Sequence, residues 1–320
     1  MKKLFALVII ISLLLSGCGS EKIGTDYDFS KVAEETMSAI MDSAKNPGHS
    51  SIFGEWSVIV AVRYGAKVPD GWYDIYYNNL CETMVKENGI LSSTKHSNYS
   101  RAVIALTAAG KDITNVSGYN LIDNYKDFDT ITKQGLPGAI FALIAFDTVG
   151  YDFPEDGNVT REILIDYILE EEYEVGGWAL QGENPDVDIT AQVIQALAPY
   201  YGKDENITAA VNRAVEHLSD VQKPDGGFFA WEGENAQSAA QVVIALTSVG
   251  VDIRNDERFI KGENWIGSYL MTYYLGGGAF CHTIGLGKDP MATDQCMQAL
   301  IALDLFDKGE GRFYDFSDIN

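Results

Sequence analysis

The chain has 320 residues, and 46 acidic side chains against 23 basic ones give it a formal net charge of −23. This excess of negative charge argues against binding to nucleic acid and against electrostatic adhesion to anionic lipid. The chain lacks a serine-histidine-aspartate order, a phosphate-binding glycine loop and a calcium loop, which excludes the common hydrolase and kinase chemistries. With 46% hydrophobic residues, it can still bury a large core.

The first 17 residues have the features of an export signal. Lys2 and Lys3 precede an apolar run over 4–15 that is too short to span a membrane comfortably. The run ends in Leu-Ser-Gly-Cys at 15–18, which resembles the lipobox of bacterial lipoproteins. The resemblance implies a signal peptide over 1–17 and an acyl chain such as palmitate on Cys18. We therefore expect a lipid anchor in the cell membrane, with the protein on the extracytoplasmic face.

Two further regions follow the signal. Residues 18–30 are mostly small or polar and show no periodicity, which suits a flexible tether between the lipid and a folded body. From Lys31 the helical pattern continues to about Leu305, and no second linker interrupts it. We therefore expect a single domain over 31–320. Cleavage would remove two lysines and take the net charge to about −25.

The domain contains an internal repeat, marked by an alanine followed by leucine or valine within an apolar stretch. The pairs are Ala61-Val62, Ala105-Leu106, Ala142-Leu143, Ala196-Leu197, Ala245-Leu246 and Ala299-Leu300. Their spacing of about 37 to 54 residues accommodates two helices and their turns in each unit. The spacing predicts an all-α protein that forms a ring or stack of six helical hairpins.

The predicted helices alternate between buried and amphipathic patterns. In chain order, buried helices are expected over 52–62 and 102–109, the latter stopped by Gly110, and again after the acidic loop that begins at Pro185, as far as Leu197. The helix over 208–218 is amphipathic, with apolar residues on one face and charged residues on the other, and is expected outside. Asp188 or Thr190 is expected to cap the N-terminus of the helix that ends at Leu197.

Glycine turns that deliver an aromatic side chain lie between the units. They are Gly176-Gly177-Trp178, Gly226-Gly227-Phe228 and Gly276-Gly277-Gly278-Ala279-Phe280. Glycine permits tight reversals, and the aromatic rings are expected to pack neighbouring hairpins together. Trp178 is the expected exception, because the acidic loop beside it makes contact with a ligand plausible there.

These turns, the sequence Gln-Lys-Pro-Asp-Gly-Gly-Phe at 222–228 and the Thr-x-Gln-x-x-x-Ala-Leu helix starts resemble the prenyltransferase and squalene-cyclase repeat family. The resemblance runs from about Ile52 to the C-terminus and implies an α/α toroid. The nearest likeness is to secreted bacterial repeat lipoproteins, with a more distant one to the helical domain of cobalamin carriers. Cobalamin is therefore one ligand to consider, although we expect no counterpart of the carriers' smaller β domain after Leu305.

The segment Pro-Asp-Val-Asp-Ile-Thr-Ala at 185–191 is similar to the D-x-D-D-T-A motif of class II terpene cyclases. The resemblance places Asp188 on the catalytic proton donor of that family. Ile189 occupies the position of the neighbouring carboxylate, which helps to keep such an acid protonated. A general acid and a structural residue at the rim are therefore both open interpretations of Asp188.

Asp294 and Cys296 resemble the Asp-x-Cys zinc ligands of protein prenyltransferase β subunits, but the partner histidine of that family is missing. We expect neither zinc nor another cofactor, and the alternative for Cys296 is a small buried core residue. With Cys18 acylated, three cysteines remain. Cys281 and Cys296 could form a disulfide or remain free thiols, and both alternatives stay open.

The inner helices of a toroid begin at one rim, so their entry residues should surround a single opening. Those residues are Asn98, Gln134, Asp188, Gln237, Thr293 and Asp294. The residues expected to contact a ligand there are Trp178, Asp186, Asp188, Gln237 and Asp294. Partial positive charge at the helix N-termini is expected to hold Asp188 ionised, which would make it a poor proton donor.

The favoured interpretation is therefore an exported, lipid-anchored toroid that binds a small molecule or a peptide at its mouth without catalysis. The alternative is a terpenoid-cyclase-like enzyme that uses Asp188 as general acid. The expected partners are the membrane, through the lipid on Cys18, and one unidentified ligand.

The first prediction concerns the anchor. Replacing Cys18 by serine removes the acylation site, so Cys18→Ser should move the protein from the membrane fraction to the soluble extracytoplasmic fraction. Fractionation of the producing cells followed by immunoblotting measures this. Equal membrane association of the parent and the variant would contradict the prediction.

Overall fold

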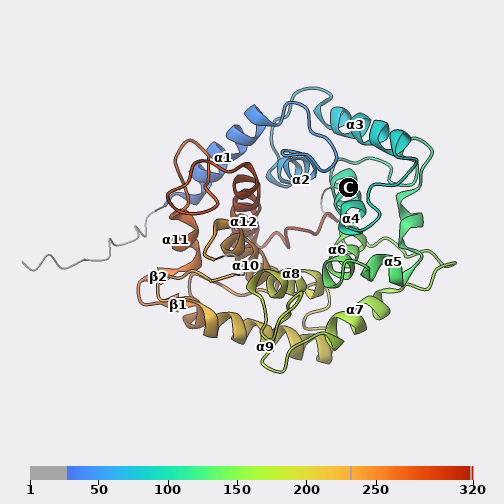
Figure 1. Ribbon diagram of the computed structural model, residues 1–320. Coiled ribbons are helices and arrows are strands. Elements are labelled where there is room, and N and C mark those ends of the chain that lie inside the picture. Colours follow the sequence, from blue (N-terminus) through green and yellow to red (C-terminus); the bar gives the residue numbers. More distant parts are fainter. Residues whose placement is uncertain (1–26, 231–232, 318, 320) are drawn as a thin grey trace, which may run out of the picture.

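A computed structural model describes residues 27–230, 233–317 and 319, so the predicted export signal and Cys18 lie outside the described residues. The described chain is almost entirely helical and forms a closed ring (Figure 1). The first helix, α1, begins at Phe29, two residues before the expected domain boundary. Asp28 caps it by accepting a hydrogen bond from the backbone N–H of Lys31 at 3.0 Å.

Six inner helices line the ring. They are α2 (Glu55–Tyr64), α4 (Ser97–Ala108), α6 (Leu136–Asp147), α8 (Val187–Leu197), α10 (Ala236–Ser248) and α12 (Pro290–Lys308). Each inner helix packs against the next, and α12 packs against α2 to close the circle (Figure 1). The predicted all-α toroid of six hairpins is therefore confirmed.

The outer layer is less regular. It consists of α1 (Phe29–Ser43), α3 (Trp72–Lys86), η1 (Leu121–Tyr125) with α5 (Phe128–Thr132), α7 (Arg161–Glu170), α9 (Glu205–Val221), and η2 (Glu257–Phe259) with α11 (Ile266–Met271). A short antiparallel hairpin precedes α11. Its strands, β1 (Ile260–Lys261) and β2 (Asn264–Trp265), have two residues each, and Ile260 pairs with Trp265. No helix in the described part of the chain is both long and apolar enough to cross a bilayer.

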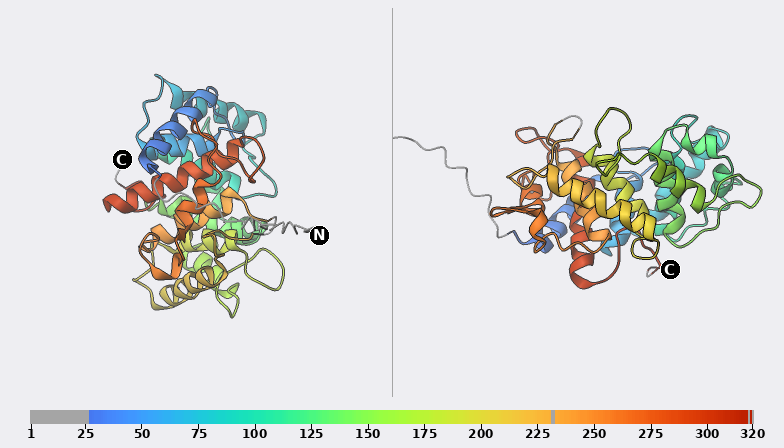
Figure 2. Two further views of the ribbon diagram at one scale, coloured as in Figure 1. Left: turned by 90° about the vertical axis from the view of Figure 1, so that its left-hand side faces the viewer. Right: turned by 90° about the horizontal axis from the view of Figure 1, so that it is seen from below.

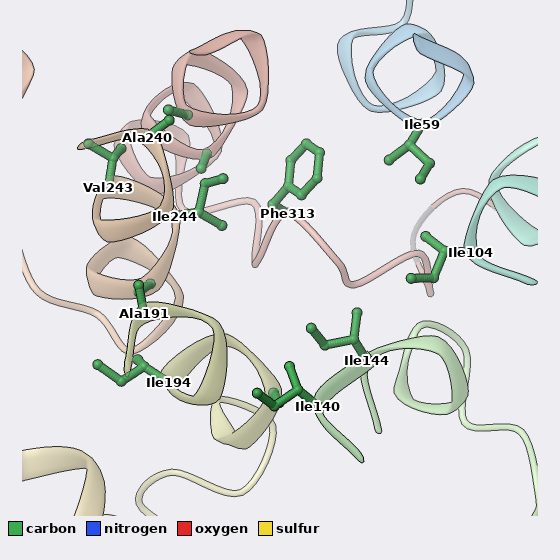
Figure 3. Packing of buried hydrophobic residues seen from close by; sticks show 14 of the residues in the cluster. Ile59, Ile104, Ile140, Ile144, Ala191, Ile194, Ala240, Val243, Ile244 and Phe313 are labelled. Carbon is green, nitrogen blue, oxygen red and sulfur yellow. The ribbon is translucent and has the colours of Figure 1, made fainter. Parts of the chain in front are cut away.

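Burial follows the two layers. The inner helices are covered on nearly all sides because they lie between the outer helices and side chains that fill the ring. In α9, by contrast, Val211, Ala214 and Leu218 are buried while Asn212 and Glu216 are exposed, as its amphipathic pattern predicts. Figure 3 shows isoleucines from several inner helices converging on the ring interior.

The C-terminal segment fills one end of the ring. Its Phe313 and Phe316 are buried, and Figure 3 places Phe313 among the inward-pointing isoleucines. The backbone N–H of Phe316 donates to the carbonyl of Thr148 at 2.8 Å, and the Arg63 guanidinium donates to the carbonyl of Arg312 at 3.0 Å. The loops that enter the inner helices lie at the other end (Figure 2). We call these the plugged end and the open end.

The plug generates a stability prediction. Phe313→Ala should lower the free energy of unfolding by about 3 to 5 kcal/mol, because it empties a closely packed site inside the ring. Urea unfolding followed by circular dichroism measures the change. Phe229→Ala is the matched control, since the Phe229 side chain is 66% exposed and its loss should cost far less. Equal losses in the two variants would show that the plug contributes nothing.

Candidate functional site

A cavity of about 470 Å³ with mixed polar and apolar walls lies at the open end, where α8, α10 and α12 begin. Its lining residues are Leu180, Gln181, Asp186, Asp188, Ile189, Gln192, Asn235, Gln237, Gln241, His282, Met291 and Gln295. Among these described residues there are two carboxylates, six carboxamides and one imidazole, but no lysine or arginine. The wall therefore accepts and donates hydrogen bonds without supplying a fixed positive charge.

The lining follows the repeat. Each of the three helices begins with a side-chain N-cap, in which Asp186, Asn235 and Asp289 accept from a backbone N–H three residues later. The side chains two and six residues after each cap line the cavity, because positions four apart lie on one helix face. These are Asp188 and Gln192 on α8, Gln237 and Gln241 on α10, and Met291 and Gln295 on α12.

The entry to α8 differs in detail from the sequence expectation. The cap is Asp186, whose carboxylate accepts from the Ile189 N–H at 3.0 Å, and not Asp188 or Thr190. The Thr190 hydroxyl accepts from the backbone N–H of Trp178 at 2.9 Å and donates to its carbonyl at 3.1 Å. Thr190 thus fastens the glycine turn to the helix, which leaves Asp188 free to face the cavity.

Trp178 does not line the mouth, which corrects the expectation for this residue. Its side chain is fully buried, and its indole N–H donates to the carbonyl of Ile168 at 2.7 Å. The glycine turn directs the ring into the wall between neighbouring hairpins. Trp178 therefore has the same packing role as the other aromatic residues of these turns.

Asp188 is the most perturbed group of the cavity wall. Burial is the main influence and raises the pKa of Asp188 to about 6. A hydrogen bond with Ser238 and the nearby His282 lower this pKa, whereas the negative charge of Asp186 raises it further. Its Oδ1 atom is buried without a hydrogen-bond partner. The helix N-terminus therefore does not keep the pKa of Asp188 low, because loss of hydration outweighs the helix dipole, although the group is still mostly ionised at pH 7.

His282 is a cavity residue that the sequence analysis did not select. Its Nδ1 lies 2.5 Å from the Gln237 side-chain oxygen, and its carbonyl accepts from the Ala236 N–H at 3.0 Å. These contacts hold the imidazole against the start of α10. The signal that could have identified it is register, since His282 follows Phe280 by two residues just as the lining residue Leu180 follows Trp178.

Glutamine side chains connect the three helices below the mouth. The amide of Gln195 donates to the Gln241 side-chain oxygen at 3.0 Å, and the Gln241 amide donates to that of Gln295 at 3.2 Å. The chain of amides runs from α8 through α10 to α12. It fixes the donor and acceptor pattern that the wall presents.

Asp294 lies in the wall and not on the cavity surface. The Ser57 hydroxyl of α2 donates to its carboxylate at 3.1 Å, and burial raises the pKa of Asp294 to about 7. Cys296, two residues on, is buried near Cys281 and Asp289, so the two proposed metal ligands point to different neighbours. Within the described residues, no three histidine, cysteine or acidic side chains cluster as a metal site. Cys281 and Cys296 are free thiols.

The other predicted entry residues contribute less. Asn98 accepts from Arg101 at 2.7 Å, Gln134 accepts from the Ser97 N–H at 3.2 Å, and neither lines the cavity. Thr293 binds the Phe280 N–H at 3.1 Å, as Thr190 binds Trp178. Of the five expected ligand contacts, the structure brings together Asp186, Asp188 and Gln237 at the cavity.

Comparison with known proteins agrees with this architecture. The family model of the squalene-hopene cyclase C-terminal domain matches residues 142–296. Among solved structures, a variant of the type II terpene cyclase MstE from Scytonema in its apo form is similar, with a TM-score of 0.56 and 14% identity. The match covers 87% of this chain and 97% of that one. No curated protein sequence matches.

Two variants of unsaturated glucuronyl hydrolase from Streptococcus agalactiae are also similar, with TM-scores of 0.53 and 0.55 and identities of 12% and 9%. Each match covers 86% of this chain, and 89% and 90% of the respective hydrolase. At such identities the likeness concerns the fold alone. The class is thus an all-helical toroid with a cavity at one mouth. Within that class, the family model over 142–296 and the similar terpene-cyclase fold support the prenyltransferase and squalene-cyclase α/α-toroid superfamily.

The environment of Asp188 makes a prediction about pH. Because its pKa is higher in the folded chain than the ordinary value of 3.8, this group favours folding most below about pH 4, and the contribution is lost as the pH rises through about 6. Asp188→Asn stays neutral throughout. The free energy of unfolding of Asp188→Asn minus that of the parent should therefore increase by up to about 3 kcal/mol from pH 4 to pH 7.

Urea unfolding at a series of pH values measures this gain. The stability of Asp294→Asn relative to the parent should also increase with pH, and over a range that extends to higher pH, since the pKa of Asp294 is raised to about 7. A difference between Asp188→Asn and the parent that does not change with pH would contradict the assignment.

Proposed function

We propose that this protein is an exported, lipid-anchored toroid that binds a small molecule or a peptide in the cavity of the open end without chemical turnover. The observation that carries the proposal is the preformed cavity of about 470 Å³, within the usual size range of ligand sites. Apolar side chains such as Leu180 and Met291 mix there with convergent amides and carboxylates. Hydrogen bonds would orient the ligand, and apolar contacts would supply affinity.

The charge of the cavity wall limits the chemical class of ligand that can bind. A diphosphate or carboxylate group would meet Asp186 and Asp188 and, among the described lining residues, no lysine or arginine to pair with. Neutral or positively charged ligands suit this wall better. Isoprenoid diphosphates are therefore poor candidates.

The geometry of the chain also suits an anchored receptor. The first turns of α1, at Phe29 and Ala33, lie beside the last turns of α12, including Asp304 and Lys308, at the plugged end. The tether to Cys18 therefore joins the domain at the end opposite the cavity. From Cys18 to the start of α1 at Phe29, its extended length is at most about 40 Å. An anchor placed there would leave the open end facing away from the membrane.

Acid catalysis of the terpenoid-cyclase type is the second candidate. A specific observation favours it, because a pKa of about 6 leaves part of the Asp188 population protonated near neutral pH. The adjacent position is Ile189, so no second carboxyl group is available there to share the proton. We rank binding first for this reason.

The test is a ligand screen with a blocked cavity. The chain without residues 1–18 is titrated calorimetrically with cobalamin, squalene, isoprenoid diphosphates and cell-wall peptides. A ligand of the cavity should bind the parent saturably and lose binding in Gln192→Trp, which fills the cavity. Asn206→Trp, on the exposed surface of α9, is the control and should bind normally.

The same samples separate the two candidates. Saturable binding with unchanged ligand supports the receptor. Turnover of squalene or another isoprenoid that is abolished by Asp188→Asn would replace the proposal by the cyclase alternative.

A further inference from the structure

Exposed apolar side chains lie in the cavity wall and in the loops that lead to the cavity at the open end. We call this set the apolar rim, and its members are Leu180, Phe229, Ile284, Leu286 and Met291, each more than half exposed. Four of them belong to the loops before α8, α10 and α12, and Met291 lies in the first turn of α12. Leu180 and Met291 also line the cavity.

The plugged end differs. Its exposed large apolar side chains are Tyr27, Tyr64, Ile163 and Ile319, and each is only 37% to 40% exposed. Exposed apolar groups gathered at the mouth of a pocket mark a contact surface, whereas scattered ones do not. The difference between the two ends therefore points to a partner at the open end.

The cavity beside the apolar rim favours a ligand with a positively charged group. Asp188 has a buried carboxylate oxygen without a hydrogen-bond partner, and Asp186 contributes a second carboxylate to the same wall. The His282 imidazole beside them is already bonded through Nδ1 to Gln237. A buried acceptor of this kind is best satisfied by a charged donor such as an ammonium or a guanidinium group.

We propose that the open end docks a basic, amphipathic peptide segment, with one lysine or arginine side chain inserted beside Asp188 and neighbouring apolar side chains packed on the apolar rim. This inference rests on the proposed binding function and names its ligand class. The net charge of −23 attracts such a segment and speeds its encounter with the cavity.

Other occupants fit the observations less well. A small amine confined to the cavity would leave Phe229, Ile284 and Leu286 exposed, since these do not line it. A second copy of the chain would bring two strongly acidic surfaces together. The membrane of the lipid anchor adjoins the plugged end under the proposed orientation, and its anionic lipids would repel the acidic surface.

The experiment is affinity selection from a random peptide library on the immobilised mature chain, prepared as Cys18→Ser so that it carries no lipid. The expected result is enrichment of sequences with one lysine or arginine flanked by apolar residues. The enrichment should disappear on Asp188→Asn. Selection without preference for basic residues would overturn the proposal.

Affinities of one enriched peptide then assign the contacts. Replacing its basic residue by norleucine should weaken binding to the parent by about 10-fold or more, while Asp188→Asn should bind both peptides equally weakly. Leu180→Ser combined with Phe229→Ser should weaken both peptides to the same extent, and Ile163→Ser at the plugged end should change neither. A norleucine peptide that binds the parent as tightly as the basic one would overturn the charge pairing.

Three further probes decide the occupant. If butylammonium bound with the same affinity as the peptide, or if the double rim variant kept the affinity of the parent, the proposed contact with the apolar rim would be overturned. If the unlipidated chain bound phosphatidylcholine vesicles through the apolar rim, the rim would be a membrane contact. If the chain formed a dimer in sedimentation that depended on the rim, the rim would be an interface between two copies. If only a neutral ligand bound, and Gln192→Trp abolished its binding, this inference would be wrong while the proposed function would still hold. If no tested ligand or peptide bound, both would be wrong.

Discussion

The ring depends on the close approach of each glycine turn to the backbone of the next hairpin. A Cβ atom on Gly176 would lie 2.7 Å from the carbonyl oxygen of Arg213, and one on Gly226 would lie 2.8 Å from that of Trp265. Gly278 meets the carbonyl of Glu35 in the same way, so the last turn contacts the first helix. All three glycines have positive φ, which other residues rarely adopt. These contacts set the spacing of the hairpins, and hence the width of the mouth.

Much of the fold could be predicted because it is encoded in local patterns that recur. The alanine-leucine pairs identified the inner helices, and the amphipathic pattern of 208–218 identified an outer one. The side chains that reach the cavity were harder to predict, since they depend on the rotation of each helix about its own axis. Asp294 looked as suitable as Asp188 in the sequence, yet it faces Ser57 on α2. Trp178 lies beside the acidic loop in the sequence but points into the wall.

Burial was the quantity that sequence reasoning could not supply. The helix N-terminus near Asp188 is visible in the sequence, whereas the burial that outweighs it depends on how the hairpins pack. The register of the repeat contained more information than the motifs did. Counting from each N-cap selects Gln192, Gln241 and Gln295 together, although no family motif draws attention to all three. In repeat proteins, equivalent positions thus identify a shared wall better than isolated signatures.

The C-terminal plug has a consequence for the order of synthesis and folding. Arg63, at the end of the first inner helix, bonds to Arg312, 249 residues later, and Ser57 bonds to Asp294 across 237 residues. Neither contact can form until nearly the whole chain has been made. The growing chain can build its hairpins in sequence, but the interior stays unfilled until Phe313 and Phe316 arrive. A chain that ended before Phe313 would thus lack these two buried aromatic rings, so truncation at this point would remove part of the core.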